Sequence, residues 1–311
     1  MASFHLCADA DATALARAKA IAGLTVSVCI PARDEEATIG GIVAAVRRDL
    51  MEEAPLVDEV VVIDDESRDA TAGVARREGA QVLAAESLLP ALPSGSGKGN
   101  ALWKSLYASD GDLLCFLDAD VRNFGSHFVT SLLAPLLGDA GVAMVKAFYR
   151  RPLHGEPTGG GRVTELMARP LLSHLFPPLT RFVQPLAGEC AARREVLETV
   201  PFVQGWGVEI GLLIDIVRQF GPAAVAQVDL GIREHRNRPI ADLGPQALAI
   251  LVTALRRAGL ERDAGRSRAV AELVRFGDSL LPEHLVVEVD ERPPMLTVPE
   301  YRAKFGRELT A

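Results

Sequence analysis

The stretch DLLCFLDADVRN, residues 112–123, places two carboxylates directly after an apolar run. Residues 113–117 predict a buried strand, and Asp118 and Asp120 follow with only Ala119 between them. A small residue at a strand end lets a nucleotide approach the backbone while one carboxylate reaches a divalent metal. Few oxygen ligands suit Mg²⁺ or Mn²⁺ bridging a diphosphate, with water and substrate completing the shell. The alternative is an acidic loop, in which this spacing also occurs by chance.

Two other strands are predicted to end in polar clusters. The apolar run LTVSVCIPA leads into PARDEE, residues 31–36, and DEVVVIDDES leads into DDESRD, residues 64–69. Each cluster alone could be a solvated turn or a helix N-cap. Because active sites of parallel sheets lie outside the carboxyl ends of the strands, three such clusters predict a site at one sheet edge.

Glycine-rich loops supply the candidate anion contacts. The loop LPSGSGKGNALW fails as a P-loop, because position 92 is Leu and position 99 is Gly, but Lys98 could contact a diphosphate. In GGGRVTEL, three glycines and Arg162 at a helix start suit a phosphate or carboxylate. The alternatives are a mobile loop with a solvated lysine and a plain capping loop.

Two further segments carry candidate polar groups. In REHRNRP, residues 233–239, His235 could complete a metal site, and Asn237 with the arginines could hold an anionic acceptor, unless this is a solvated basic turn. In GWGVEIGLL, Glu209 could serve the helix dipole or hydrogen-bond a sugar or acceptor hydroxyl, and Trp206 is either a sugar platform or core. Glu189 in PLAGE raises the same choice as Glu209.

The elements needed to position these groups alternate between strands and helices. This alternation over residues 24–150 predicts an α/β fold with a mostly parallel sheet and helices on both faces. Residues 1–23 are interpreted as a helical extension and 151–311 as an acceptor-binding half with C-terminal helices, all in one continuous domain. In the second half, residues 185–200 predict a turn followed by a helix, and about 244–276 a last helical segment.

Composition limits the classes of function. The 311 residues include 33 Lys and Arg against 41 Asp and Glu, and a formal net charge of -8 disfavours nonspecific nucleic-acid binding. The four dispersed cysteines are typical of reduced, buried thiols in a cytoplasmic protein. The N-terminus does not resemble a signal peptide, and no apolar run approaches the roughly 18 residues that a membrane span needs.

Taken in order, the motifs PARDEE, DDESRD, GKG, DAD, GGGRVTE, PLAGE, GWGVEIGLLID, HRNRP and ERPPM resemble the glucosyl-3-phosphoglycerate synthases and the related mannosyl-3-phosphoglycerate synthases of actinobacteria. The resemblance covers roughly residues 24–296. It implies a retaining, metal-dependent glycosyltransferase with the GT-A fold, an α/β fold with a mostly parallel central sheet and a helical C-terminal acceptor-side region.

The resemblance also implies roles for individual residues. The metal would be bound by Asp120 and His235. The catalytic residues would be Glu209, Asp120 and Leu186, with Leu186 and Glu209 flanking the sugar. The donor would contact Pro31, Ala32, Glu35, Asp65, Lys98, Asp118, Ala119 and Asp120, and the acceptor Gly161, Arg162, Val163, Thr164 and Asn237.

The implied reaction transfers a hexose from a nucleoside diphosphate sugar, with UDP-glucose favoured, to the 2-hydroxyl of D-3-phosphoglycerate. A divalent metal, Mg²⁺ or Mn²⁺, would stabilise the leaving diphosphate. GDP-mannose remains an alternative donor. More distant alternatives are a polyprenyl-phosphate glycosyltransferase, a sugar-1-phosphate nucleotidyltransferase and a noncatalytic nucleotide-sugar binder. The family implies a homodimer, without nucleic-acid or membrane partners.

Overall fold

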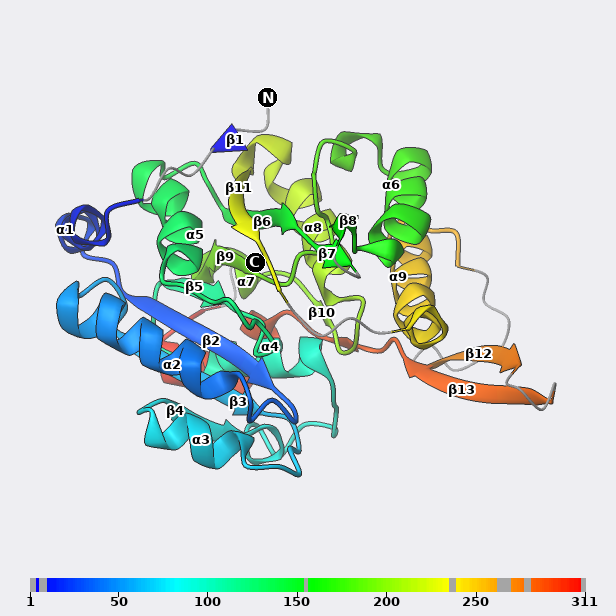
Figure 1. Cartoon of the computed structure of the whole chain (residues 1–311), viewed down its shortest axis with the longest axis horizontal. Coiled ribbons are helices and arrows are strands. Elements are labelled where there is room, and N and C mark those ends of the chain that lie inside the picture. The colour runs from blue at the N-terminus through cyan, green and yellow to red at the C-terminus, as the bar shows by residue number, and fades with distance from the viewer. Residues whose placement is uncertain are drawn as a thin grey trace.

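A mixed eight-stranded sheet runs through the molecule (Figure 1). The structure, a computed structural model, describes residues 4–5, 10–153, 156–234, 239–261, 270–276 and 281–308. Neighbouring strands are parallel except β9, which is antiparallel to both β5 and β6. The prediction of a mostly parallel sheet is therefore confirmed. In spatial order the strands are β1 (Phe4–His5), β11 (Val225–Ile232), β6 (Met144–Arg150), β9 (Cys190–Arg193), β5 (Leu113–Phe116), β2 (Val26–Ala32), β3 (Glu59–Asp64) and β4 (Gln81–Ala84).

Helices cover both faces of this sheet (Figure 1). Val28 and Ile30 of β2 pack with α1 (Ala12–Ala22), α2 (Ile39–Arg47), α3 (Thr71–Arg77) and α5 (His127–Gly138). Cys29 belongs to the opposite layer, which includes α4 (Lys98–Ala108), α6 (Arg169–Leu175), α8 (Val208–Phe220), α9 (Gly244–Arg257) and α10 (Pro299–Phe305). Because both faces of β2 are buried, its sequence is apolar except for Ser27, rather than alternating between apolar and polar residues.

The prediction of one helical segment over about 244–276 is wrong in its second part. Helix α9 ends at Arg257, and β12 (Val270–Phe276) pairs with β13 (Pro282–Glu288) as an antiparallel hairpin. Side-chain exposure alternates along β12, with Ala271 and Leu273 packed on a small core cluster and Val274 exposed. This period of two is that of a strand, and it contradicts a purely helical C-terminal region.

The prediction of a turn followed by a helix over residues 185–200 misses a strand. Cys190–Arg193 forms β9 between β5 and β6, and the helix that follows, α7, covers only Arg194–Leu197. Alanine favours helices in isolation, but Ala191 and Ala192 are buried between two strands whose hydrogen bonds they complete. Tertiary pairing thus overrides the local preference.

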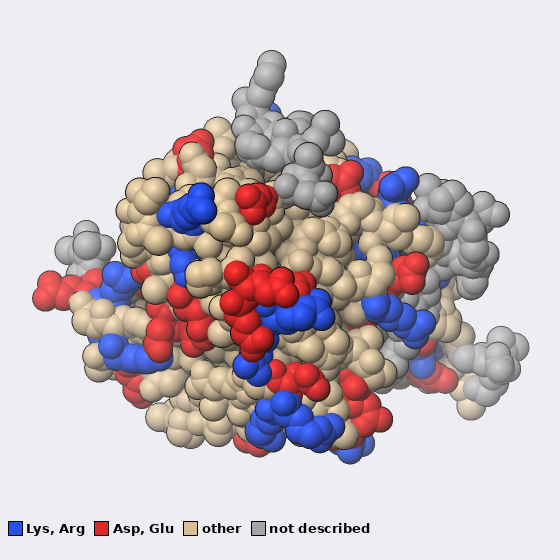
Figure 2. Space-filling view, turned by 60° about the vertical axis from the view of Figure 1, so that its left-hand side comes forward, with Lys and Arg blue, Asp and Glu red and all other residues tan. Residues whose placement is uncertain are grey.

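Charges of both signs are mixed on the molecular surface. Figure 2 shows acidic and basic side chains lying beside one another across one face. Among the described residues, no helix is both long enough and apolar enough to cross a lipid bilayer.

Candidate active site

The DAD turn follows β5 and is fixed by neighbouring strand ends. The backbone N–H of Leu117 still donates to Cys29 O of β2 at 3.1 Å, which continues the ladder to the residue before Asp118. The Thr38 hydroxyl then donates to Ala119 O at 2.6 Å, at the start of α2. The aspartates therefore lie at the carboxyl edge of the sheet, where the sequence predicts a site.

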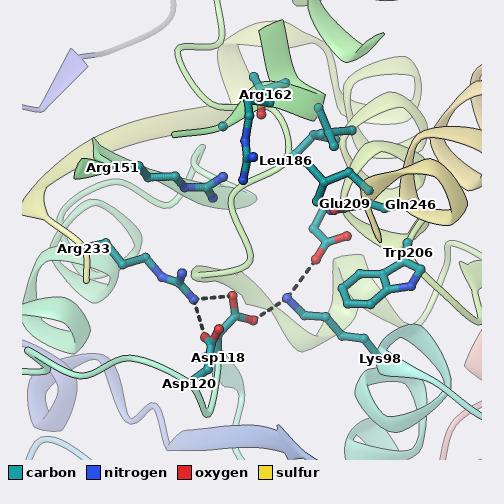
Figure 3. A pocket seen from close by; sticks show the side chains of 14 residues that line it. Lys98, Asp118, Asp120, Arg151, Arg162, Leu186, Trp206, Glu209, Arg233 and Gln246 are labelled. Carbon is teal, nitrogen blue, oxygen red and sulfur yellow. Dashed lines mark hydrogen bonds and ion pairs between the residues drawn. The ribbon is translucent and has the colours of Figure 1, made fainter. Parts of the chain in front are cut away.

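Two cations hold the two aspartates (Figure 3). Nη2 of Arg233 lies 2.8 Å from Asp118 Oδ2 and 2.8 Å from Asp120 Oδ1. Nζ of Lys98 ion-pairs with Asp118 and, at 2.8 Å, with Glu209. Burial alone would raise the pKa of the Asp118 carboxyl, but Lys98 and Arg233 outweigh it and hold that pKa well below its usual range. Asp118 is therefore ionised at neutral pH.

A cavity of about 150 Å³ opens over this cluster (Figure 3). It gathers residues 161–164 of the GGGRVTEL segment, Leu186 of the PLAGE turn and Glu209 in the first turn of α8. The residues predicted from the sequence that line it are Lys98, Asp118, Asp120, Gly161, Arg162, Val163, Thr164, Leu186 and Glu209. Trp206, for which the sequence left a sugar platform or a core position open, also lines the cavity. Arg151, Arg233, Leu243 and Gln246 complete the lining.

A second cavity of about 350 Å³ adjoins the first at the ends of β2 and β3. It is lined by all eight predicted donor-binding residues, Pro31, Ala32, Glu35, Asp65, Lys98, Asp118, Ala119 and Asp120, together with Arg33, Gly97, Ala101, Gly205 and Trp206. Lys98, Asp118, Asp120 and Trp206 line both cavities. A reacting atom at their junction would therefore face one larger and one smaller binding space.

The metal site is described only in part. His235 and Asn237 lie outside the described residues. Within the described ones, no cluster of three or more His, Cys, Asp or Glu side chains could hold a metal ion. Asp120 keeps 29% of its side chain exposed and uses only Oδ1 for Arg233. Because Mg²⁺ is commonly bound by one or two carboxylates plus substrate phosphates, this donor set fits a metal whose shell the substrate completes.

Several site residues were not singled out from the sequence. Arg151 directly follows β6, and the only sign of it in the sequence is the pair of adjacent arginines in the run YRRP. Its Nη2 donates to the Tyr149 hydroxyl at 2.9 Å. Gln246, near the start of α9, had no signal. Lys146 is buried in β6 and donates to Ala187 O, so it supports the turn that carries Leu186.

Glu189 has a structural position rather than a place in the cavity lining. Its side chain is completely buried and accepts from the Tyr149 hydroxyl at 2.7 Å and from Arg233 Nε at 2.6 Å. Its contacts favour neither of the roles considered for it from the sequence, a helix-dipole partner or a hydrogen bond to a sugar or acceptor hydroxyl. Instead, Glu189 supports Arg233 from inside the sheet.

Sequence comparisons identify relatives over almost the whole chain. The family model described as Glycosyl transferase family 2 matches residues 27–199. The glucosyl-3-phosphoglycerate synthase of Petrotoga mobilis is 42% identical, covering 98% of this chain and 97% of its own. The one from Mycolicibacterium paratuberculosis is 47% identical, covering 89% of this chain and 85% of its own.

The comparison of structures agrees with these relatives. The crystal structure of glucosyl-3-phosphoglycerate synthase from Mycobacterium tuberculosis, in complex with Mn²⁺, UDP-glucose and phosphoglyceric acid, matches with a TM-score of 0.85 at 42% identity. The match covers 95% of this chain and 98% of that one. The GT-A fold expected from the sequence is thereby confirmed.

Proposed function

Since the chain belongs to glycosyl transferase family 2 and, within it, to the glucosyl-3-phosphoglycerate synthases, we propose that it transfers glucose from UDP-glucose to the 2-hydroxyl of D-3-phosphoglycerate. The observation that carries this proposal is the junction of two cavities at Lys98, Asp118 and Asp120. The larger cavity is assigned to the nucleotide sugar and the smaller one to the three-carbon acid.

On the donor side, Pro31, Ala32, Glu35 and Asp65 would surround the nucleoside, and Lys98 would contact the diphosphate. Asp120, with His235, would hold the divalent metal. A bound Mg²⁺ or Mn²⁺ stabilises the negative charge of the leaving diphosphate. Arg233 and Lys98 hold the Asp118 and Asp120 carboxylates in fixed orientations, which limits the reorganisation needed when the donor binds.

On the acceptor side, phosphoglycerate carries a phosphate and a carboxylate that both need cationic or N–H partners. Arg162 and Arg151 line the small cavity, beside the backbone of Gly161 and the side chain of Thr164. Guanidinium groups and exposed N–H groups suit both anions. This local positive charge explains how an acidic protein could bind an acidic acceptor. Asn237 is proposed as a further acceptor contact.

For the reaction itself, we favour attack from the face that the leaving group occupies. In this scheme the hydroxyl oxygen bonds to the anomeric carbon as its bond to the diphosphate breaks, and the leaving phosphate receives the hydroxyl proton. Glu209, held by Lys98 at 2.8 Å, would orient the acceptor hydroxyl, and Leu186 would flank the sugar. A trapped glycosyl-enzyme adduct would contradict this scheme.

The decisive experiment is a turnover assay with 3-phosphoglycerate and Mg²⁺ or Mn²⁺, given UDP-glucose or GDP-mannose in parallel. We expect release of UDP and formation of a phosphorylated glucoside. Faster release of GDP from GDP-mannose would instead favour the mannosyl reaction. Folded protein that turns over neither donor would refute the proposal.

We also propose a homodimer in the cytoplasm. On the exposed face of the β12–β13 hairpin, Val274 is 47%, Phe276 67% and Val286 71% exposed, and apolar area of this kind favours association. Burial of Cys29, Cys115 and Cys190 as free thiols suits a reducing compartment. The mass of the protein in solution, measured by light scattering, should be twice that of one chain, and the Val286→Glu variant should have a mass closer to that of one chain. A monomer at micromolar concentration would contradict the dimer.

A further inference from the structure

The segment 288–293, which contains the start of the ERPPM motif, has no role in the proposed function and yet lies beside the donor site. Its strand β14 (Glu291–Arg292) pairs antiparallel with β10 (Phe202–Val203). Beyond that pairing, the segment contacts residues 93–97, which we call the glycine loop. The two segments are almost 200 positions apart in the chain, so the contact is a product of the fold.

Arg292 joins the glycine loop to helix α4. Its side chain is buried, its Nη1 donates to Pro93 O at 2.8 Å, and its Nε donates to Asn100 Oδ1 at 2.8 Å. The Asn100 amide in turn donates to Gly95 O at 2.9 Å. The guanidinium also lies over the Trp103 ring, 5.4 Å from its centroid. The rigid guanidinium group of Arg292 thus binds the residues on both sides of the glycine loop, Pro93 at its start and Asn100 just after its end.

Two other contacts join residues 288–293 to the glycine loop and to helix α4. The Ser96 hydroxyl donates to Glu288 Oε2 at 3.0 Å, and Trp103 Nε1 donates to Pro293 O at 2.8 Å. A Cβ at Gly95 would lie 1.9 Å from Gln204 Oε1 and 2.1 Å from Arg292 Nη2, so a side chain there would force these two groups to move. The close approach of the loop to Arg292 therefore depends on this glycine.

The far end of the glycine loop belongs to the donor cavity. The Gly97 N–H donates to Asp65 Oδ2 at 3.0 Å, and Lys98 follows at the start of α4, ion-paired with Asp118 and Glu209. Gly97, Asp65 and Lys98 all line the larger cavity. Since residues 94–97 are two serines and two glycines, the loop would sample many conformations if it were not tethered.

We propose that Arg292 is a positioning residue for the donor site, which fixes the glycine loop so that Gly97 and Lys98 meet a nucleoside diphosphate in one arrangement. The inference rests on the proposed function for the identity of that ligand. It predicts a selective effect: weakening the tether lowers the affinity for the donor more than that for the acceptor. Lys98 lines both cavities, but the arginines of the acceptor cavity, Arg151 and Arg162, lie on other segments.

The test compares Arg292→Lys with a matched control, Arg194→Lys. Arg194 is equally buried and donates to Gly111 O, Leu106 O and Ser109 O, away from the glycine loop. Lysine keeps the charge but cannot bond Pro93 and Asn100 with one rigid fork. We expect Arg292→Lys to raise both the Kd for UDP with Mn²⁺ and the KM for UDP-glucose roughly tenfold. This is about the change in affinity that loss of one charge-assisted hydrogen bond causes. The KM for phosphoglycerate should stay within about twofold, and Arg194→Lys should lower only the Tm.

A second variant, Gly95→Ala, approaches the same contact from the loop side and should reproduce the selective loss of donor affinity. It also decides the matter if Arg292→Lys does not fold. Unchanged affinity for UDP in both folded variants would overturn the proposal, as would equal increases in both KM values. If the unmodified protein binds UDP but transfers no glucose, the proposed function fails, while weaker UDP binding by the variants would still support the positioning role.

Discussion

The guanidinium of Arg233 donates from Nε to the buried carboxylate of Glu189 at 2.6 Å, and its Nη2 bridges Asp118 and Asp120. One arginine therefore connects the interior of the sheet to the aspartates of the site. The Tyr149 hydroxyl donates to the other Glu189 oxygen at 2.7 Å, so both carboxylate oxygens are satisfied. Among the described residues, Arg233 forms ion pairs with three carboxylates, whereas Glu189 forms an ion pair with Arg233 alone. Loss of Arg233 would therefore leave the buried Glu189 carboxylate without an ion-pair partner.

Replacement of Arg233 by Met should therefore lower the free energy of unfolding by about 3–5 kcal/mol, since it leaves the Glu189 carboxylate buried without a cation. The double variant Glu189→Gln with Arg233→Met should recover part of this loss, because the fully buried side chain at position 189 is then neutral, while Asp118 keeps its ion pair with Lys98. Urea unfolding of the two variants and the unmodified protein measures both values. Equal stability of the single and double variants would show that the buried charge is not the cause.

Replacement of Asp120 by Asn should abolish metal-dependent turnover. The change removes the negative charge from a carboxylate at the junction of both cavities, and metal stabilisation of a leaving group is worth several kcal/mol, so we expect a loss of about a thousandfold or more. Mn²⁺ binding, followed by electron paramagnetic resonance, should weaken in parallel. Asp110→Asn is the control, because this aspartate is exposed and pairs with Lys304 at the surface. Full activity of Asp120→Asn would exclude Asp120 as a metal ligand.

The first half of the fold was predictable because its signals are local. Continuous apolar runs in β2, β3 and β5 mark strands buried on both faces, and the polar clusters after them follow from the rule on strand ends. The second half was less predictable. Strand β9 is four residues long with alanines at its centre, and only its place between β5 and β6 makes it a strand.

The candidate site shows the same division. Lys98, Arg162 and Glu209 were identifiable because glycines flank each of them at a helix start. Arg151 and Gln246 reach the cavity from β6 and α9 without any such flanking pattern. The bond between Arg292 and Asn100 joins residues 192 positions apart, which no periodicity or local motif encodes.

Replacement of Arg162 by Ala should weaken binding of the acceptor. Arg162 lines the small cavity, and loss of one guanidinium–anion contact should raise the KM for phosphoglycerate roughly 10- to 100-fold, with a smaller change in the KM for UDP-glucose. Initial rates at varied acceptor concentration give these values. Arg169→Ala is the matched control, because Arg169 lies on α6 and pairs with Glu165 outside the cavity. A larger effect on the donor KM than on the acceptor KM would reassign this arginine.

Three of the four cysteines should be unreactive in the native protein over a wide pH range. Burial raises the pKa of Cys29 to about 12 and that of Cys190 to about 11, and it raises that of Cys115 as well. Since the thiolate is the nucleophile, a reagent such as Ellman's should modify these thiols slowly even at pH 9, where a free thiol of pKa about 8.5 is mostly ionised. Deprotonation is easier in the unfolded chain, so the stability that these thiols contribute is fully present below about pH 8.5 and declines as the pH rises above it.

The labelling experiment has two controls. We expect all four thiols to react in concentrated guanidinium, and the Cys7→Ser variant to show almost no reaction in its native state. Rapid native modification of two or more thiols would contradict the burial of this part of the sheet.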